Sequence, residues 1–434
     1  MKQASIQLTH ISKKINGTVQ LTGSKSESNR ALIIQALSQG RVSIENLSEA
    51  ADTVTLEKAL QQAQAAVSNT ATQTNTATSD QQDNATPVWN TIDIGPAGTA
   101  MRFLTSYLNL VPANFILTGS ERMQQRPIGI LVDALKTLGA AIQYEDKNGY
   151  PPLKIEGGFL QGQNNIPIQG NISSQYISSL LLVASSLEKG LTLTIAGELT
   201  SKPYVSMTLA MLNEVGIASS WSGDEITIAP QVPSKSTLFV EPDWSAASYW
   251  YAIVALSDNG HIVLPGLKRH SLQGDMAIVD IMQHFGVASS FQEDGLHLTR
   301  VDAATDKKEF DFKECPDLAQ TVVVVAAARK QDITLTGLET LKIKETNRIA
   351  ALQNEIGKFG AKLIEENQVY YLKTADVYAP ESISIQTYED HRMAMAFAPL
   401  ALCFQSITIE EPQVVEKSYP DFWKHLQSQG FKIN

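Results

Sequence analysis

The sequence contains few cysteines and no long apolar run. Its 434 residues include two cysteines, Cys315 and Cys403, and no Cys/His spacing typical of a zinc site. Two thiols are too few for a disulfide framework, so we expect a reduced protein without a bound metal. Runs such as 322–328 and 397–404 fall well short of the ~20 apolar residues that a membrane helix needs. Residues 1–17 lack the apolar core of a signal peptide, so a cytoplasmic protein is expected.

Positive charge is also scarce. The chain has 34 basic and 45 acidic residues, giving a formal net charge of −11. A nucleic-acid-binding protein would need a basic stripe, but the Lys and Arg residues are spread singly along the chain. We therefore expect neither nucleic acid nor a membrane as a partner, and we expect a monomer. The apolar fraction of 43% allows a real core, and the length suggests about two to four domains.

One stretch has almost nothing to bury. Residues 68–87 are nearly all Ser, Thr, Asn, Gln, Ala and Asp. Such a composition cannot repay the entropy of packing into a core. We interpret the stretch as a flexible surface insertion.

A repeated pattern organises the rest of the chain. Amphipathic segments stop at a glycine and continue as a strand at Gly139, Gly216, Gly286, Gly360 and Gly430. A sixth copy would fall near 63–67, where the polar stretch obscures it. Strand-like runs interleave with these ends at 42–47, 115–118, 191–196, 262–265, 333–336 and 407–409. Their spacing of roughly 70–77 residues exceeds short solenoid periods and predicts six βαβα-type modules, three in each of two globular bodies.

Polar and charged residues recur where the module helices should begin. The first helices start near Ser26, Gly98, Ser174, Ser245, Asp317 and Asp390, and the second near Asp52, Arg126, Lys202, Asp275, Glu345 and Lys417. Converging helix N-termini bind anions through unpaired N–H groups and a partial positive charge. Ser245, Asp52 and Asp275 fit ordinary N-caps. Lys25, Arg126 and Lys417 do not, because the helix dipole disfavours a cation at a helix start, so we assign them a function.

Several segments suit the binding of anions. Residues 23–30 combine a glycine with Ser26, Lys25 and Arg30, although the spacing is not that of a Walker loop. In 95–102, Gly98 opens the backbone N–H groups to a ligand, whereas Arg102 fits a structural role equally well. Further polar groups stand at helix starts at Ser173, Ser174, Gln175, Ser201 and Tyr204.

Acid–base residues occur in the second half of the chain. Asp317 precedes a very apolar helix, where a buried carboxylate can stay ionised and accept a proton. Lys344 and Arg348 share a helix face, although a Glu345–Arg348 pair on a solvated helix is an alternative. Arg392 stands beside apolar residues, which suggests that it faces a ligand. The adjacent lone histidine is assigned no chemistry.

Nine segments, in this order, resemble the 5-enolpyruvylshikimate-3-phosphate synthase family of enolpyruvyl transferases. They are GSKSESNRA, GTAMR, RPIG, SSQY, SKPY, PDLAQT, KETNR, DHRMAM and EKSYPD, spread from Gly23 to Asp421. The resemblance implies an α/β (α+β) fold class: a two-domain inside-out α/β barrel with three βαβαββ repeats in each domain and an active site in the cleft between them. One domain would comprise 1–21 with 242–434, and the other 22–241.

The same resemblance implies a reaction and its residues. The enolpyruvyl group of phosphoenolpyruvate would pass to the 5-hydroxyl of shikimate 3-phosphate and phosphate would leave, without a metal or organic cofactor. Shikimate 3-phosphate would be bound by Lys25, Ser26, Arg30, Ser173, Ser174, Gln175, Ser201, Tyr204, Asp317, Thr340 and Lys344. Phosphoenolpyruvate would be bound by Lys25, Gly98, Arg126, Gln175, Arg348, Arg392 and Lys417. Asp317 would accept the hydroxyl proton, Glu345 would protonate the methylene carbon to give a tetrahedral intermediate, and Lys25 would complete the catalytic set.

The sequence departs from the family pattern at two positions. The family usually has Asn where Pro96 stands, and proline removes a donor beside the expected phosphoenolpyruvate site. This change bears on affinity for phosphoenolpyruvate and for glyphosate, a herbicide that competes there. Thr340 stands where some members have a substrate-binding Asn.

Two other functions remain open. A sister transferase acting on UDP-N-acetylglucosamine has a similar fold, but it typically carries a cysteine in the loop corresponding to 119–126, which has none here. A non-catalytic anion-binding relative would lack Asp317, Glu345 or Lys25, and all three are present.

Overall fold

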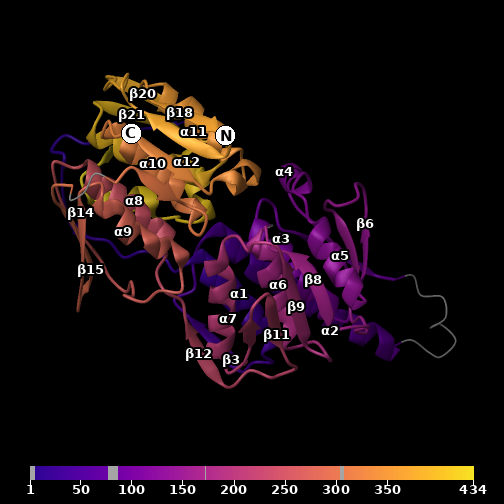
Figure 1. The fold of residues 1–434 in the computed structure, drawn as a ribbon. Coiled ribbons are helices and arrows are strands. Elements are labelled where there is room, and N and C mark those ends of the chain that lie inside the picture. The colour runs from indigo at the N-terminus through magenta and orange to yellow at the C-terminus, as the bar shows by residue number, and fades with distance from the viewer. Residues whose placement is uncertain (1–4, 77–86, 172, 304–306) are drawn as a thin grey trace. The chain divides into compact units, whose positions relative to one another are not determined.

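The computed structural model describes residues 5–76, 87–171, 173–303 and 307–434. The chain folds into two compact units (Figure 1). Unit 1 comprises Met1–Ser24 and Glu241–Asn434, and unit 2 comprises Lys25–Val240. These boundaries lie within three residues of the crossings expected from the sequence. That these units are two domains of three repeats each stays a prediction.

Unit 2 is built from alternating strands and helices. In chain order its elements are α1 (Lys25–Leu37), β3 (Val42–Glu45), α2 (Ala51–Thr76), β4 (Trp89–Asp93), α3 (Gly98–Tyr107), η2 (Leu108–Leu110), β5 (Asn114–Thr118), α4 (Glu121–Gln124), α5 (Gly129–Leu138), β6 (Ala141–Tyr144), β7 (Leu153–Glu156), β8 (Asn165–Gln169), α6 (Ser174–Ala184), β9 (Leu191–Ala196), α7 (Lys202–Glu214), β10 (Ser220–Ser222), β11 (Glu225–Ile228) and β12 (Ser236–Phe239).

Unit 1 repeats the same alternation. Its elements are β1 (Ser5–Thr9), β2 (Lys14–Thr18), α8 (Trp244–Leu256), β13 (Asn259–Leu264), η3 (Gly274–Ala277), α9 (Ile278–Gln283), β14 (Val287–Gln292), β15 (Gly295–Arg300), β16 (Glu309–Asp311), η4 (Pro316–Leu318), α10 (Ala319–Ala328), β17 (Ile333–Thr336), η5 (Glu339–Ile343), α11 (Arg348–Gly357), β18 (Lys362–Glu366), β19 (Val369–Lys373), β20 (Ser382–Ile385), α12 (His391–Phe397), η6 (Ala398–Leu402), β21 (Ser406–Glu410), η7 (Pro412–Lys417), α13 (Phe422–Ser428) and β22 (Lys432–Ile433).

The sheets show the predicted βαβαββ repeat. In one module of unit 2 the strand order is β4-β5-β7-β6, with β4 parallel to β5 and β7 antiparallel to it. The described residues form four more four-stranded sheets with the same arrangement and one two-stranded sheet, β12-β3. All six strand-like runs expected from the sequence overlap strands, namely β3, β5, β9, β13, β17 and β21, although the runs at 42–47 and 262–265 extend past the ends of β3 and β13.

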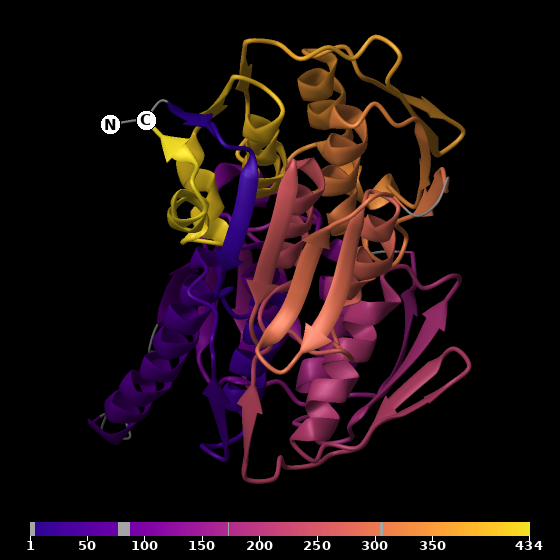
Figure 2. The ribbon, with the colours of Figure 1, turned by 90° about the vertical axis from the view of Figure 1, so that its left-hand side faces the viewer.

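The N-terminal segment completes two modules of unit 1. Strand β1 pairs antiparallel with both β21 and β22, and β2 runs parallel to β13. Figure 2 shows this indigo segment beside the yellow C-terminal end of the chain. The backbone N–H of Gln7 donates to the carbonyl of Asn434 at 3.0 Å, so the first and last described strands share one sheet.

The predicted glycine stops are confirmed at five helix ends. Gly139, Gly216, Gly286, Gly360 and Gly430 all have positive φ, between 76° and 116°. This left-handed conformation ends a helix and is easiest for glycine, which has no Cβ.

The prediction of a sixth helix end near 63–67 was wrong. Helix α2 runs without a break from Ala51 to Thr76, through both this position and the first part of the stretch interpreted as a flexible insertion. The physical reason is that α2 contains no Gly or Pro and is rich in Ala, Gln and Leu up to Val67, so nothing stops the helix. Residues 77–86 of that stretch lie outside the described residues.

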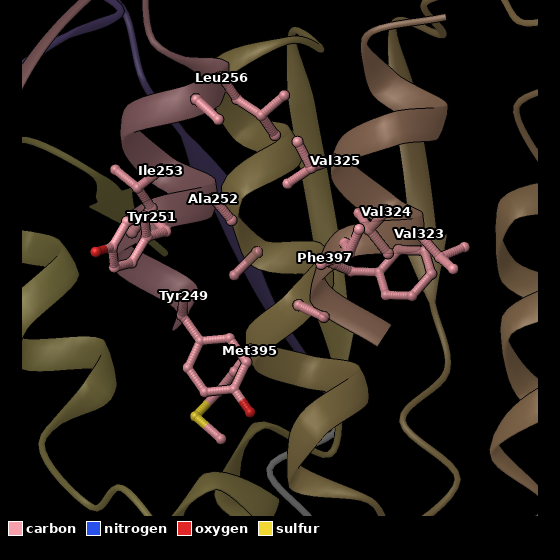
Figure 3. Packing of buried hydrophobic residues seen from close by; sticks show 14 of the residues in the cluster. Tyr249, Tyr251, Ala252, Ile253, Leu256, Val323, Val324, Val325, Met395 and Phe397 are labelled. Carbon is pink, nitrogen blue, oxygen red and sulfur yellow. The ribbon is translucent and has the colours of Figure 1, made fainter. Parts of the chain in front are cut away.

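The core of each unit is formed around the first helix of each module. In unit 1, α8, α10 and α12 pack against one another and are buried on all sides. Figure 3 shows their apolar side chains directed together, including Tyr249, Val324 and Phe397. In unit 2, α1, α3 and α6 pack in the same way. A helix that is apolar all round needs such burial, so the starts of these helices are held rigidly.

No helix of the described residues is long and apolar enough to cross a membrane.

Candidate functional site

The expected site residues fall into two groups, one in each unit. Unit 2 contains Lys25, Ser26, Arg30, Gly98, Arg126, Ser173, Ser174, Gln175, Ser201 and Tyr204, and unit 1 contains Asp317, Thr340, Lys344, Glu345, Arg348, Arg392 and Lys417. Each group is described within its own unit.

Arg348 is the centre of the group in unit 1. It is the first residue of α11 and only 2% exposed. Its guanidinium donates to Asp390 Oδ2 at 2.6 Å, to Asp317 Oδ1 at 2.8 Å and to Glu345 Oε2 at 2.9 Å. These three carboxylates raise its pKa against the lowering effect of burial, so Arg348 stays charged. One buried cation therefore fixes three acidic side chains from three segments.

A second arginine and two lysines complete this cluster. Arg392 Nη2 lies 3.0 Å from Asp317 Oδ2, and Lys344 Nζ lies 3.7 Å from Asp317 Oδ1. Lys417 Nζ lies 3.5 Å from Glu345 Oε1. The sequence had left open whether Glu345 and Arg348 form an isolated pair on a solvated helix; the buried network excludes that alternative.

The charges around Asp317 decide its protonation. Burial raises the pKa of this carboxyl, but Arg392, Lys344 and Arg348 outweigh burial and hold the pKa well below its usual range. Asp317 is therefore ionised at neutral pH, as the sequence predicted. Its partners also make it a weak base while they remain in place.

Ser245 and Asp275 do not act as the helix caps that the sequence suggested. The N-cap of α8 is Asp243, whose side chain accepts from Ala246 N at 2.9 Å. The Ser245 hydroxyl instead donates to Asp275 Oδ2 and accepts from Arg392 Nη2 at 3.2 Å. Both residues thus belong to the charged cluster.

The pKa of Asp275 has a consequence for stability. Burial and the nearby Asp317 carboxylate raise this pKa from 3.8 to about 6. A carboxyl with a raised folded-state pKa stabilises the protein fully below its unfolded pKa, and this contribution is lost as the pH rises through the folded value. Ionised Asp275 should therefore cost stability above about pH 6.

We expect Asp275→Asn to gain stability relative to the parent chain as the pH rises from 4 to 7. The gain has an upper limit of about 3 kcal/mol, since one pKa unit corresponds to 1.36 kcal/mol. Thermal unfolding of both chains across this range measures the difference. A melting-temperature difference that is constant with pH would show that Asp275 does not titrate there.

In unit 2, Lys25 is paired rather than exposed. It is the first residue of α1, and its Nζ lies 3.2 Å from Asp52 Oδ2 near the start of α2. The ion pair offsets the unfavourable position of a cation at a helix N-terminus. Asp52, expected as a plain cap, is this partner, and Ser26 follows in the same turn.

Two arginines of unit 2 are anchored inside the unit. Arg30 donates to Thr208 Oγ1, Ser178 Oγ and the carbonyls of Ser26 and Tyr204 at 2.8–3.2 Å. Burial lowers its pKa to about 10, which leaves it charged at neutral pH. Its role as a ligand-binding residue stays a prediction. Arg102 donates to the carbonyls of Gly98 and Pro127, which favours the structural role.

Arg126 and Gly98 form a donor group at the start of α3. A Cβ added at Gly98 would lie 2.5 Å from Arg126 Nη1, so only glycine leaves this cation in place. The N-cap of α3, Ala97, makes no side-chain cap. Arg126 Nε is buried and has no hydrogen-bond partner in the described structure. The exposed Pro96 stands two residues before Gly98.

Arg126 and Lys417 do not stand at helix starts, contrary to the sequence interpretation. Arg126 lies three residues before α5, and Lys417 is the last residue of η7, with α13 starting only at Phe422. The dipole argument therefore does not apply to these two cations. Their assignment now depends on their neighbours instead.

The remaining polar residues line helix starts. Ser173 caps α6 by accepting from Gln175 N at 3.4 Å, and Gln175 Nε2 donates to Thr99 Oγ1 at 3.2 Å. Ser201 is the N-cap of α7 in a left-handed conformation, with φ of 53°, and makes no side-chain cap. In unit 1, Thr340 Oγ1 is buried without a hydrogen-bond partner among the described residues.

The comparisons with known proteins bear on what this arrangement does. The family model for EPSP synthase (3-phosphoshikimate 1-carboxyvinyltransferase) matches residues 9–426. The chain belongs to the EPSP synthase family. A curated relative from Bacteroides fragilis (strain YCH46), named 3-phosphoshikimate 1-carboxyvinyltransferase, is 45% identical over 97% of each chain. Another with the same name, from Sulfurovum sp. (strain NBC37-1), is 37% identical over 95% of this chain and 96% of its own.

Solved structures show the same fold. The EPSP synthase of Acinetobacter baumannii aligns with a TM-score of 0.75 over 100% of both chains, at 19% identity. The enolpyruvyl transferase NikO of Streptomyces tendae aligns with a TM-score of 0.71 over 99% of this chain and 98% of its own, at 14% identity. The predicted fold class is thereby confirmed.

The sequence pattern does not reveal three members of the charged cluster in unit 1. Asp390 stands in the pattern only as a helix start, yet its carboxylate binds Arg348. Ser245 and Asp275 fit ordinary caps in the sequence, but both belong to the cluster. A usable signal existed for Asp390, because it belongs to the DHRMAM segment that carries the family resemblance. Among the residues with described positions, no three or more His, Cys, Asp or Glu side chains are placed so that they could hold a metal ion.

Proposed function

We propose that this chain transfers the enolpyruvyl group of phosphoenolpyruvate to the 5-hydroxyl of shikimate 3-phosphate and releases phosphate. Family membership over nearly the whole chain supports the reaction. The single observation that carries the mechanism is the position of Asp317, which contacts Arg348, Arg392 and Lys344 at once. A base held among cations suits a reaction between two anions.

The two groups of residues have different tasks in this proposal. In unit 2, Lys25, Arg126 and the start of α3 supply cationic and backbone donors for phosphate. Ser173, Ser174, Gln175, Ser201 and Tyr204, with Arg30, serve the hydroxyl and charged groups of shikimate 3-phosphate. In unit 1, Arg348 and Arg392 bind the carboxylate of phosphoenolpyruvate, since a guanidinium fork matches a carboxylate. Lys417 serves the phosphate, and Lys344 and Thr340 bind shikimate 3-phosphate.

The first step adds the substrate hydroxyl to the double bond. The 5-hydroxyl oxygen attacks C2 of phosphoenolpyruvate while its proton passes to Asp317. Glu345 must first take up a proton as substrate binding releases it from Arg348 and Lys417. The C2–C3 electron pair then takes this proton, and C3 becomes a methyl group in a tetrahedral intermediate. In the second step the Glu345 carboxylate takes back a methyl proton, the double bond re-forms and the C2–O bond to phosphate breaks. The leaving phosphate takes the displaced electron pair, so atoms and charges balance.

Substrate binding must exchange ion pairs in the cluster. Without ligand, Arg348 and Arg392 are paired with Asp317, which depresses the pKa of that carboxyl. When a substrate carboxylate engages the two arginines, part of their charge is neutralised and Asp317 becomes a stronger base. The acid–base residues thus act as temporary partners of the cations that later bind substrate. Donors already fixed in place need little reorganisation during the reaction.

A phosphate-release assay tests this function. The chain should release phosphate from phosphoenolpyruvate only when shikimate 3-phosphate is present. UDP-N-acetylglucosamine, offered as the alternative acceptor, should give no release. Phosphate release with UDP-N-acetylglucosamine but not with shikimate 3-phosphate would assign the chain to the sister transferase reaction. If neither acceptor led to phosphate release, a non-catalytic anion-binding protein would be favoured.

Gly98→Ala should weaken phosphoenolpyruvate binding without unfolding the chain. The added Cβ meets the end of the flexible Arg126 side chain, which can move away and so leave the phosphate donors incomplete. We expect the KM for phosphoenolpyruvate to rise by about tenfold or more, consistent with the loss of one charge-assisted hydrogen bond. Gly357→Ala is the matched control, because nothing lies within 4 Å of its added Cβ. An unchanged KM in Gly98→Ala would remove Arg126 from the phosphate site.

The same proposal includes a monomeric, cytoplasmic enzyme. Cys315 and Cys403 form no disulfide, as is usual in a reducing compartment. Sedimentation equilibrium should give the mass of one chain, and a dimer mass would contradict the monomer.

A further inference from the structure

Asp275 is a buried carboxyl group that the proposed reaction does not use. It lies in η3, is 5% exposed, and its Oδ2 accepts from the Ser245 hydroxyl. Its Oδ1 is buried and has no hydrogen-bond partner in the part of the chain that the structure describes. A carboxyl group in such a place is costly, so its presence calls for a reason.

The Ser245 hydroxyl links this carboxyl to the reaction centre. A serine hydroxyl has one proton, and here Asp275 receives it. The oxygen lone pairs of Ser245 are thereby directed to Arg392 Nη2, at 3.2 Å. The same nitrogen lies 3.0 Å from Asp317 Oδ2. Asp275, Ser245, Arg392 and Asp317 therefore form one chain of hydrogen bonds.

We propose that Asp275 is a positioning residue for the transfer reaction: it orients the Ser245 hydroxyl so that Arg392 remains aimed at the carboxylate of the enolpyruvyl donor. This inference rests on the proposed function. Arg392 loses its contact with Asp317 when a substrate carboxylate takes that place. Ser245 then holds Nη2, and only an acceptor at position 275 keeps the serine proton turned away from the guanidinium.

The charge environment agrees with this role. Burial raises the pKa of Asp275 to about 6, as do the carboxylates of Asp317 and Asp243, while Arg392 and the Ser245 hydrogen bond oppose the shift. Burial, and after it the Asp275 carboxylate, raises the pKa of the Cys315 thiol. A carboxyl group that lowers the stability of the fold at neutral pH is typical of a functional rather than a structural residue.

Asparagine and alanine at position 275 separate positioning from charge. Asp275→Ala removes the acceptor for Ser245, so we expect the KM for phosphoenolpyruvate to rise about tenfold with kcat within about threefold of the parent. The KM for shikimate 3-phosphate should stay at the parental value. Asp275→Asn retains an acceptor oxygen and should recover most of the lost affinity.

Ser245→Ala breaks the same chain of hydrogen bonds at its middle. It should raise the KM for phosphoenolpyruvate to the same extent as Asp275→Ala, and the double variant should be no worse than either single variant. Such non-additivity shows that the two side chains act on the ligand through one path. If Asp275→Ala does not fold, Ser245→Ala decides the question, because it leaves the buried carboxyl in place.

The control variant is Asp280→Ala, which removes an exposed carboxylate from α9, five residues after Asp275. Its kcat and its KM for each substrate should match those of the parent. Parental KM values in both alanine variants, additive losses in the double variant, or equal increases in KM for both substrates would overturn the inference. In each of these cases the parent chain is active, so the proposed function stands. If the parent releases no phosphate from the two substrates, the proposed function fails and the inference with it.

Discussion

Asp317→Asn should lower kcat by on the order of 10²–10⁴, the usual contribution of a positioned general base. The substitution preserves the shape of the side chain and one acceptor oxygen, but the amide cannot take the proton of the attacking hydroxyl. Arg348, at 2.8 Å, and Arg392, at 3.0 Å, would still surround the position. The effect should therefore fall on the chemical step.

The KM for phosphoenolpyruvate should not rise in this variant. Removing the negative charge of Asp317 leaves Arg348 and Arg392 less neutralised, which favours an incoming carboxylate. A large loss in kcat with an equal or lower KM is the pattern of a group needed in the transition state, beyond any role in binding. Steady-state kinetics with both substrates measures the two values.

A matched substitution at the surface controls for general effects. Asp376→Asn changes the same functional group in an exposed ion pair with Lys362, and kcat should be unaffected. Near-parental turnover in Asp317→Asn would remove Asp317 from the proton transfer. The base would then have to be sought among the other carboxylates bound to Arg348.

Local rules predicted the repeated architecture because each module carries its own signals. Glycines such as Gly139 and Gly360 mark helix ends by a conformation that other residues adopt with difficulty. Apolar runs of a strand's length marked β9 and β17, whose bounds match the expected ranges. These features depend on neighbouring residues only, so a single sequence suffices to find them.

The sequence predictions failed at helix boundaries, which depend on more than the local composition. Helix α2 passes the expected stop at 63–67 because composition alone does not end a helix that has neither Gly nor Pro. Arg126 and Lys417 were placed at helix starts because boundaries are the least certain part of a sequence prediction. Arg126 lies between α4 and α5, and Lys417 is the last residue of η7, before α13.

The chemical residues were found more readily than their partners. The types of residue in the resembling segments identified Asp317 and Arg348 as candidates. Nothing in their spacing indicated that Arg348 would also bind Asp390, 42 residues away. The hydrogen bond from Ser245 to Asp275 spans 30 residues and joins α8 to η3 within one module. Such contacts depend on how helices pack within and between modules, which residue-by-residue reasoning does not address.

Arg348→Met should cost about 3–5 kcal/mol of unfolding free energy, the range measured when one partner of a buried ion pair is removed. Methionine fills a similar volume but leaves Asp317, Glu345 and Asp390 without their shared cation. Asp390 is fully buried and would lose the cation that its carboxylate contacts. Urea denaturation followed by tryptophan fluorescence measures this loss, because three of the five tryptophans, Trp244, Trp250 and Trp423, lie in unit 1.

Two further variants separate the effect of burial on stability from the effect of charge. Lys362→Met removes an exposed ion pair with Asp376 and should leave the denaturation midpoint nearly unchanged, because exposed pairs contribute little. Arg348→Lys retains the positive charge, but an ammonium group cannot replace the guanidinium, which contacts three carboxylates at 2.6–2.9 Å. The unfolding free energy of this variant should therefore lie between those of the parent and the methionine variant. A methionine variant as stable as the parent would show that the three carboxylates are held by other contacts, and the cluster would then owe its geometry to packing rather than to Arg348.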